Sequence, residues 1–302
     1  MNSAYQQSFL GYVSETTHGE TPTSPSMKKL RTTNPLGITP SKALLESEEV
    51  HAHRQEQDVR HGLKGIGGSI PIELSYGAFD DWLEALLSGT WGSGVLKAGT
   101  TLKTFTVEQA IADDKFNRFK GVSPTQLSLT MNPTGLITGS FDVVGMDFTS
   151  DVTTLGSAAD VATHPPFDGL GSAVIQEGGS DIATVTSAEM TLNAQKTVGA
   201  LIGKASGDVP TDGQLQVSGT LTARFNSLSL FQKFENETES SLKITFTNPG
   251  GDDTFEIMLP KLKYTSGEPQ NNDNVIDVAL GFRGLYDATE SSAIVITATD
   301  IS

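Results

Sequence analysis

The chain has 302 residues, 36 of them acidic and 20 basic, and its formal net charge is −16. It contains no cysteine, which excludes disulfide bonds and thiolate metal sites. With 36% hydrophobic residues it can bury one large core or two modest ones, and its acidity leaves no basic footprint for nucleic-acid binding.

The segment 1–62 is polar, rich in Ser, Thr, Pro and charged residues, and weakly periodic. A short helix is possible around Ser41–Val50, capped by Ser41, but its apolar content is only Ala43, Leu44 and Leu45. Alone, such a segment cannot bury enough surface to offset its chain entropy. We therefore predict an extended N-terminal arm over residues 1–62 and a β domain over residues 63–302.

A strand and a short helix follow the arm. Ile70, Ile72 and Leu74 alternate with polar residues, which is typical of a half-buried strand. The next apolar residues recur at helical spacing and predict a core helix, which carries acidic residues in its first half. The residues that define this core helix are Phe79, Trp82, Leu83 and Leu86.

Strict alternation of apolar and polar residues dominates the rest of the chain. It predicts strands within 123–131, 137–143, 187–192 and 213–225, and a second short helix over Ser227–Glu235. The outward faces of these strands are short-chained and uncharged or acidic. We expect a mainly β (α+β) fold with one or two short flanking helices.

The segment 149–184 is rich in Ser, Thr, Gly, Ala and Asp and contains Pro165-Pro166. It exceeds the roughly 12–15 residues beyond which a loop is usually functional or disordered. We predict a long inserted loop displayed at the surface.

No motif points to catalysis. The glycines from Gly62 to Gly68 precede a strand, whereas a phosphate-binding loop follows one and opens a helix. The histidines of the arm (His51, His53 and His61) lack the rigid framework of a zinc site. We predict no catalytic, cofactor-binding or metal-binding residues, and no cofactor.

One ordered series of short motifs resembles the tail tube proteins of long-tailed bacteriophages. It begins with Arg54, Asp58, Arg60 and Gly62, and continues through Gly67-Gly68. The later members of the series are Glu73–Gly77, Phe79-Asp80, Phe116–Gly121, Ser128–Thr149, Val217–Phe225, Phe231–Phe234, Thr238–Leu242, Leu259-Pro260 and Phe282–Asp287.

The resemblance implies a β-sandwich or partial barrel that closes into a hexameric β-barrel ring. Rings would stack into a hollow tube around a tape-measure protein, contact tail terminator and baseplate or tip proteins, and conduct DNA into the host without binding it specifically. The chain would be assembled in the host cytoplasm, belong to the virion tail and not insert into a membrane; it has neither a signal-peptide pattern nor eighteen consecutive apolar residues.

Two sets of residues are candidates within this hypothesis. Charged residues of the arm would contact neighbouring subunits, so deletion of residues 1–60 is predicted to leave folded protein that cannot polymerise. Polar residues of the alternating strands would line an acidic lumen. The arm candidates are Glu46, Glu48, Arg54, Asp58 and Arg60, and the lumen candidates are Asp142, Glu189, Ser140, Thr138, Thr220 and Gln216.

Two other classes remain open. A non-catalytic β-sandwich binding module of a phage fibre or surface protein would need an exposed aromatic platform, which Trp82 and Trp91 do not supply. A hydrolase with a dispersed carboxylate pair would need a pocket that sequence cannot reveal.

Overall fold

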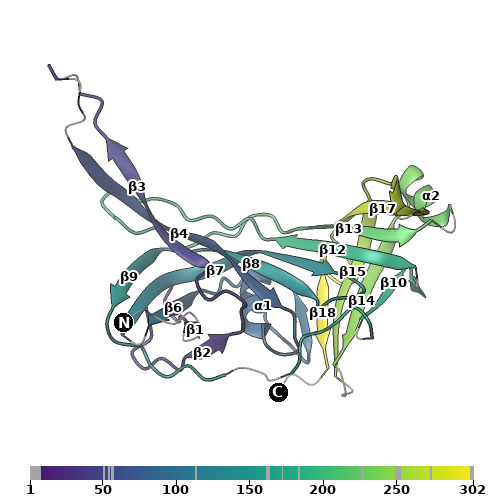
Figure 1. Ribbon diagram of the computed structural model, residues 1–302, viewed down its shortest axis with the longest axis horizontal. Coiled ribbons are helices and arrows are strands. Elements are labelled where there is room, and N and C mark those ends of the chain that lie inside the picture. Colours follow the sequence, from purple (N-terminus) through teal and green to yellow (C-terminus); the bar gives the residue numbers. More distant parts are fainter. Residues whose placement is uncertain are drawn as a thin grey trace.

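The computed structural model describes residues 8–49, 52, 53, 55, 58–112, 114–160, 164–171, 173–182, 184–225, 228–248, 253–272 and 274–299. Within these residues the fold is mainly β, with eighteen strands and two short helices, as predicted. The strands form curved sheets that pack around one elongated core (Figure 1). The sheet of the single chain is not closed into a barrel.

The first sheet lies at the N-terminal end of the body and has the order β2–β1–β6–β7–β9. Its strands are β1 (Phe9–Ser14), β2 (Lys28–Leu30), β6 (Phe105–Ala112), β7 (Lys115–Met131) and β9 (Asp147–Asp151).

The long strand β7 links this sheet to a second one. Its first half pairs with β6 and β9, and its second half pairs with β8 and β12. The second sheet has the order β4–β8–β7–β12–β13–β17–β16. Its remaining strands are β4 (Val59–Glu73), β8 (Thr138–Val144), β12 (Val185–Asn193), β13 (Gln216–Arg224), β16 (Glu268–Asn272) and β17 (Val275–Gly284).

The third group of strands covers the C-terminal part of the core. The end of β15 pairs with β17, and its first half lies between β14 and β18 in the order β11–β10–β14–β15–β18–β5. These strands are β5 (Val95–Lys97), β10 (Ala173–Glu177), β11 (Ser180–Asp181), β14 (Ser240–Thr247), β15 (Thr254–Tyr264) and β18 (Val295–Ala298).

Helix α1 (Asp80–Leu87) packs on the apolar side of β7. Trp82 is fully buried and stacks on Phe105 with ring centroids 5.3 Å apart, while Tyr12 of β1 meets Trp82 edge-on at 5.8 Å. The spacing that predicted this helix therefore describes its buried face. Helix α2 (Ser229–Glu235) lies at the far end of the molecule (Figure 1).

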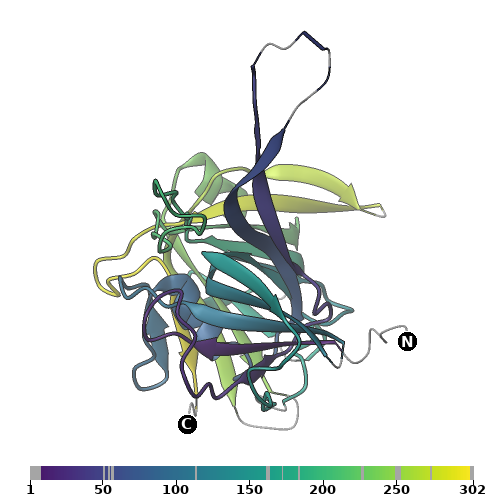
Figure 2. The ribbon, with the colours of Figure 1, turned by 90° about the vertical axis from the view of Figure 1, so that its left-hand side faces the viewer.

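A hairpin leaves the body at one end. It consists of β3 (Ile38–Glu46) and the first half of β4, and it rises well clear of the sheets (Figures 1 and 2). All residues from Thr39 to Glu46 are exposed. The prediction of a helix around Ser41–Val50 is wrong for the residues that belong to β3. In the structure β4 supplies hydrogen-bond partners for the backbone of these residues. A helix with only three consecutive apolar residues would have too small an apolar face to be stabilised by packing.

The N-terminal strands do not behave as a free arm. Leu10 and Tyr12 of β1 are buried, and β1 pairs along its whole length with β6. The predicted boundary at residue 62 falls inside β4. Of the described part of segment 1–62, the β3–β4 hairpin is what stands outside the body, so the arm hypothesis now applies to that hairpin.

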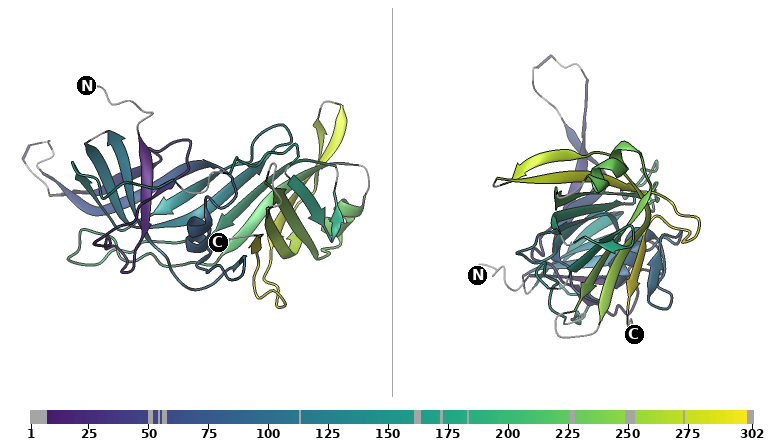
Figure 3. Two further views of the ribbon diagram at one scale, coloured as in Figure 1. Left: turned by 90° about the horizontal axis from the view of Figure 1, so that it is seen from below. Right: turned by 90° about the vertical axis from the view of Figure 1, so that its right-hand side faces the viewer.

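The segment 149–184 is also more than a surface loop. Phe167 is fully buried and stacks on Phe246 at 5.2 Å, and β10 pairs with β14 over five residues. The prediction of a displayed insertion is wrong for these parts, because a single aromatic anchor and one paired strand hold a polar segment against the core. Figure 3 shows the end of the body that contains β10, and the β16–β17 hairpin that extends sideways from this end.

Candidate functional site

One continuous polar surface crosses the second sheet. Residues of β4, β8, β7, β12 and β13 that alternate with the buried ones point away from the core. We call this surface the polar face. Its three cross-strand rows are Glu73, Thr138, Thr130, Glu189 and Thr220; Pro71, Ser140, Ser128, Thr191 and Ser218; and Ser69, Asp142, Gln126, Asn193 and Gln216.

All six lumen candidates lie on this polar face. Thr138, Ser140 and Asp142 come from β8, whereas Glu189 and Thr220 come from strands that are far away in the sequence. Their convergence depends on the strand register, which places the polar residues of five strands on one side. That this side faces a lumen remains a prediction.

Hydrogen bonds between side chains order one row of the polar face. The Gln126 Nε2 atom donates to the Asp142 Oδ2 atom at 3.2 Å and to the Ser128 Oγ atom at 3.2 Å. Asn193 Nδ2 donates to Gln126 Oε1 at 3.0 Å. The bonds to Asp142 and from Asn193 cross between strands, and that to Ser128 runs along β7; together they hold the side chain of Gln126 in place.

The charge of the polar face is acidic over most of its width. Its three rows contain Glu73, Asp142 and Glu189 and no lysine or arginine. Exposed positive charge lies beyond these rows, at Arg224 at the end of β13 and at Arg283 of β17, which stands opposite Ser218.

The lateral margins of the polar sheet are incompletely paired. At one margin, β16 pairs only with β17 among the described strands, and all five of its residues are exposed. At the other, the described residues give β3 no strand partner except β4, and Thr33 N donates to Pro71 O at 3.1 Å beside the body part of β4. Open strand edges of this kind invite pairing with another chain.

The hairpin carries the predicted interface candidates. Glu46, Glu48, Asp58 and Arg60 are exposed, and Arg60 Nε lies 3.6 Å from Asp58 Oδ2, whereas Arg54 falls outside the described residues. An exposed ion pair of this kind contributes little to stability. These charges are therefore free to act in an interface.

The base of the hairpin is fixed by a close backbone approach and an ion pair. Gly68 has a φ of +138°, and a Cβ atom at that position would lie 2.1 Å from the Gly37 carbonyl oxygen. Lys64 Nζ contacts Asp147 Oδ1 at 2.6 Å, and Lys64 N donates to Ala205 O at 2.9 Å. The direction in which the hairpin leaves the body is thus determined by the body.

One buried cation could not be anticipated from the sequence pattern. The Lys196 side chain is fully buried and donates to the Ala85 carbonyl at the end of α1 and to Ser123 Oγ at 3.1 Å. Its Nζ lies 3.1 Å from Asp212 Oδ1. Burial lowers the pKa of Lys196, while Asp212 opposes that shift. The contacts tie the long 194–215 segment to α1, which is a structural role.

A second perturbed group lies at the start of α1. Burial raises the pKa of Asp80 to about 6, and the nearby charges of Asp81 and Glu84 act in the same direction, whereas Lys28 opposes them. Asp81 is paired with Lys28 at 2.6 Å. The group lies on the core side of the molecule, away from the polar face, so it bears on stability.

Among the described residues there is no cluster of three or more His, Asp or Glu side chains with the geometry of a metal site. Of the arm histidines, His51 lies outside the described part. Neither described helix has the length and apolar character needed to cross a bilayer.

Comparison with known protein families identifies a family to which the chain is similar. The sequence model of a family described as phage tail tube protein matches residues 6–284, which is nearly the whole chain. A search of curated proteins found no significant match to this chain.

Proposed function

Since this chain belongs to the phage tail tube protein family, we propose that its copies form hexameric rings that stack into the hollow tube of a virus tail and conduct DNA during ejection. The family membership makes it a structural component of the virion tail that assembles with itself. The proposal concerns the ring, the direction of stacking and the role of each surface.

The observation that carries the proposal is the polar face with its two open margins. A sheet that is predominantly polar on one side and unfinished at both lateral edges can be completed by identical sheets on either side. If the rotation between copies closes, the result is a barrel without edges and with the polar face inward.

Ring closure would join the β16 margin of one copy to the β3–β4 margin of the next. This contact is heterologous, because two different surfaces meet, and only such a contact generates rings or filaments. The two margins leave the body in different directions (Figure 2), which suits a repeated lateral contact.

The lumen would then present short hydroxyl and amide side chains with Glu73, Asp142 and Glu189. Phosphate groups of passing DNA find no cationic site on these three rows, so DNA would slide without specific binding. We infer that the same bore holds a tape-measure protein before ejection, and that the ends of the tube meet tail terminator and baseplate or tip proteins. Assembly would take place in the host cytoplasm.

The alternative of a carbohydrate-binding module gains no support from the two tryptophans. Trp82 is fully buried, and Trp91 Nε1 donates to the Asp80 carbonyl at 3.2 Å, so the latter is held against α1. Neither tryptophan forms an exposed platform.

Electron microscopy of the purified full chain tests the proposal. Rings with six-fold symmetry, or tubes built from them, are expected, since both sheet margins are available in the free chain. Particles that remain single subunits at every concentration would refute it.

A matched pair of variants tests the margin itself. The double substitution Gln270→Lys, Asn271→Lys places charge on the β16 edge and is expected to abolish rings. Val152→Lys, at a similarly exposed site outside this edge, is expected to leave them intact. Loss of rings in both variants would argue against ring closure through β16.

A further inference from the structure

We propose that α2 and an exposed apolar residue near it form a contact surface for the first half of a second copy of this chain. The inference rests on the proposed function and deepens it by assigning an interface that lies outside the polar face. We call this surface the α2 patch, and its residues are Leu228, Leu230, Phe231, Phe234 and Ile276.

The chain contains the same series of elements twice. The first unit runs from β1 to β9 and the second from β10 to β18, and in each a helix follows the fourth strand. The hairpins β1–β2, β3–β4 and β6–β7 of the first unit recur as β10–β11, β12–β13 and β14–β15.

The longer-range strand pairings recur as well. β1–β6 corresponds to β10–β14, and β4–β8 corresponds to β13–β17. In the same way β7 pairs with β8 and β9, whereas β15 pairs with β17 and β18. The two units therefore share both the order of their elements and the partners of each strand, so α1 and α2 occupy equivalent places.

The two equivalent helices differ in how far they are covered. Every apolar residue of α1 is buried. In α2 the side chains of Leu230, Phe231 and Phe234 are half-buried, and Leu228, which directly precedes the helix, is 56% exposed. The second unit thus has an incompletely covered apolar surface where the first unit has a closed one.

Part of the cover over α1 comes from the second unit. Lys196 donates to the Ala85 carbonyl of α1, and Ser88 Oγ, at the end of this helix, donates to Asp212 Oδ2 at 2.7 Å. β5, which follows α1, pairs with β18 of the second unit. The equivalent cover over α2 would come from a second copy, because the chain has no third unit.

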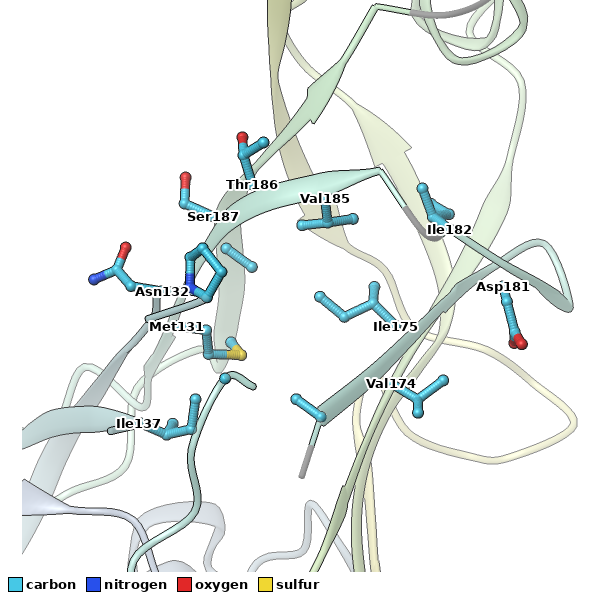
Figure 4. A pocket seen from close by; sticks show the side chains of 14 residues that line it. Met131, Asn132, Ile137, Val174, Ile175, Asp181, Ile182, Val185, Thr186 and Ser187 are labelled. Atoms are coloured by element: carbon cyan, nitrogen blue, oxygen red, sulfur yellow. The ribbon is translucent and has the colours of Figure 1, made fainter. Parts of the chain in front are cut away.

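The seam between the two units shows how units of this chain meet. The second half of β7 pairs with β12 across this seam. Beside the pairing lies a cleft of about 340 Å³, whose walls combine Met131 and Ile137 of the first unit with Ile175 and Val185 of the second (Figure 4). Strand pairing and aliphatic contact therefore occur together at a seam between units.

The α2 patch adjoins the margin that is assigned to ring closure. A Cβ atom at Gly267, in the segment between β15 and β16, would lie 3.2 Å from Phe231 Cδ2 and from Phe234 Cδ1. Phe225 N, ahead of α2, donates to the Ile276 carbonyl of β17 at 2.9 Å, and the side chain of Ile276 is 58% exposed. Figure 1 shows α2 beside β17. A copy that pairs with β16 would therefore lie next to α2.

The orientation of α2 is fixed within the single chain. Lys233 Nζ lies 2.7 Å from both carboxylate oxygens of Glu177, which is buried, and Ser240 Oγ donates to the same carboxylate. A surface that is already ordered costs less conformational entropy when a partner binds. The α2 patch is thus a preformed contact surface.

These relations select the first unit of a second copy as the occupant. Within the chain, the second unit covers the helix of the first. The same contact repeated from chain to chain places the first unit of the next copy on α2. It joins two different surfaces, as closure of a ring requires.

Photo-cross-linking in assembled tubes tests this contact. The variant Leu228→p-benzoylphenylalanine is assembled from a mixture of isotope-labelled and unlabelled chains, so that links between copies are distinguished by mass. We expect cross-links between copies, with the second peptide inside residues 9–151, which form the first unit. The control Leu170→p-benzoylphenylalanine, at a site that is 79% exposed in the segment between the units, is expected to give no such link.

The outcomes separate this inference from the function on which it rests. Tubes in which position 228 links only within its own chain, or only to residues 173–298 of another copy, would overturn the assignment. An equal yield of cross-links from position 170 would do the same. Absence of rings and tubes from the natural chain would instead refute the proposed function.

A charged substitution provides a second test. Leu228→Glu is expected to raise the concentration needed for assembly about tenfold, because loss of one buried leucine weakens a contact by roughly that factor. Leu170→Glu is the matched control and is expected to assemble as the natural chain does. Unchanged assembly of Leu228→Glu would contradict the proposal, and if this variant fails to fold, by circular dichroism, the cross-linking result decides.

Discussion

At the scale of single residues, the ionisable groups with perturbed pKa values stabilise or destabilise the body and lie away from the polar face. Lys196 bridges α1 and the 194–215 segment from a fully buried position. At Asp80 the neighbouring charges act with burial and not against it. Burial and the carboxylates of Asp81 and Glu84 all disfavour the charged form of Asp80. The N-terminus of α1 favours an anion and offsets part of this cost.

Asp80→Asn is expected to stabilise the chain at pH 7.5. The folded carboxyl titrates at about 6 and an unfolded aspartate at about 3.9. The folded state therefore binds the proton more tightly between these values, and the natural chain loses stability as the pH rises through that window. After allowance for solvent screening, the gain from the substitution is about 1 kcal/mol.

Thermal unfolding at pH 7.5 and pH 4 measures this effect. The gain is expected at pH 7.5 and should vanish at pH 4, where the natural carboxyl is already protonated. Asp114→Asn, at an exposed pair with Lys115, serves as the control and should change neither value. An equal gain at both pH values would show that charge is not the cause.

At the scale of elements, a change in the hairpin tests assembly without disturbing folding, whereas a deletion of the N-terminal segment disturbs both. The predicted deletion of residues 1–60 would remove β1 and with it Leu10 and Tyr12 from the core. Such a chain would fail to fold before its assembly could be examined. The hairpin beyond the Lys42–Lys64 pair carries no described buried residue.

Replacement of residues 43–63 by an Asn-Gly turn is therefore expected to leave the thermal unfolding midpoint nearly unchanged and to abolish tubes. Asn-Gly suits a two-residue hairpin turn, and the Lys42–Lys64 pair retains its register. Calorimetry and electron microscopy of the same preparation check the two halves of the prediction. Long tubes from the shortened chain would show that the hairpin is dispensable.

At the scale of the whole molecule, the distribution of charge agrees with a conduit. Residues 1–75 have a net charge of −1 and residues 76–302 a net charge of −15. The polar face takes part in this asymmetry through Asp142 and Glu189. Because the field of many like charges acts over the Debye length of about 10 Å at 0.1 M salt, the lumen would repel phosphate more strongly at low salt.

Glu189→Lys is expected to slow DNA ejection without affecting assembly. Glu189 is exposed on the polar face between Thr130 and Thr220, so a lysine there fits the sheet and attracts phosphate. Ejection from phage particles that carry the variant tube, measured at low and high salt, checks the effect, which should shrink as salt rises. Glu189→Gln is the matched control. Failure to assemble, with normal ejection from the few particles formed, would place Glu189 in an interface.

The sequence by itself determined the local structures whose periodicity is self-contained. The spacing of Phe79, Trp82, Leu83 and Leu86 specified helix α1, because one helix face needs no knowledge of its partner. Alternation in 123–131 and 213–225 specified strands with one polar side. The ordered motifs also pointed to the family that the comparison confirms.

Only the tertiary structure decided how these pieces combine. It brought Asp142, Glu189 and Gln216 onto one polar face, drew β1 into the core, made Ser41 part of a projecting hairpin and buried Phe167 and Lys196. Strand pairing joins residues that are distant in the chain, and its register depends on the packing of the opposite face. The spacing of apolar residues in a segment can be read from that segment alone. Which strands it pairs with depends on the free energy of packing the whole core.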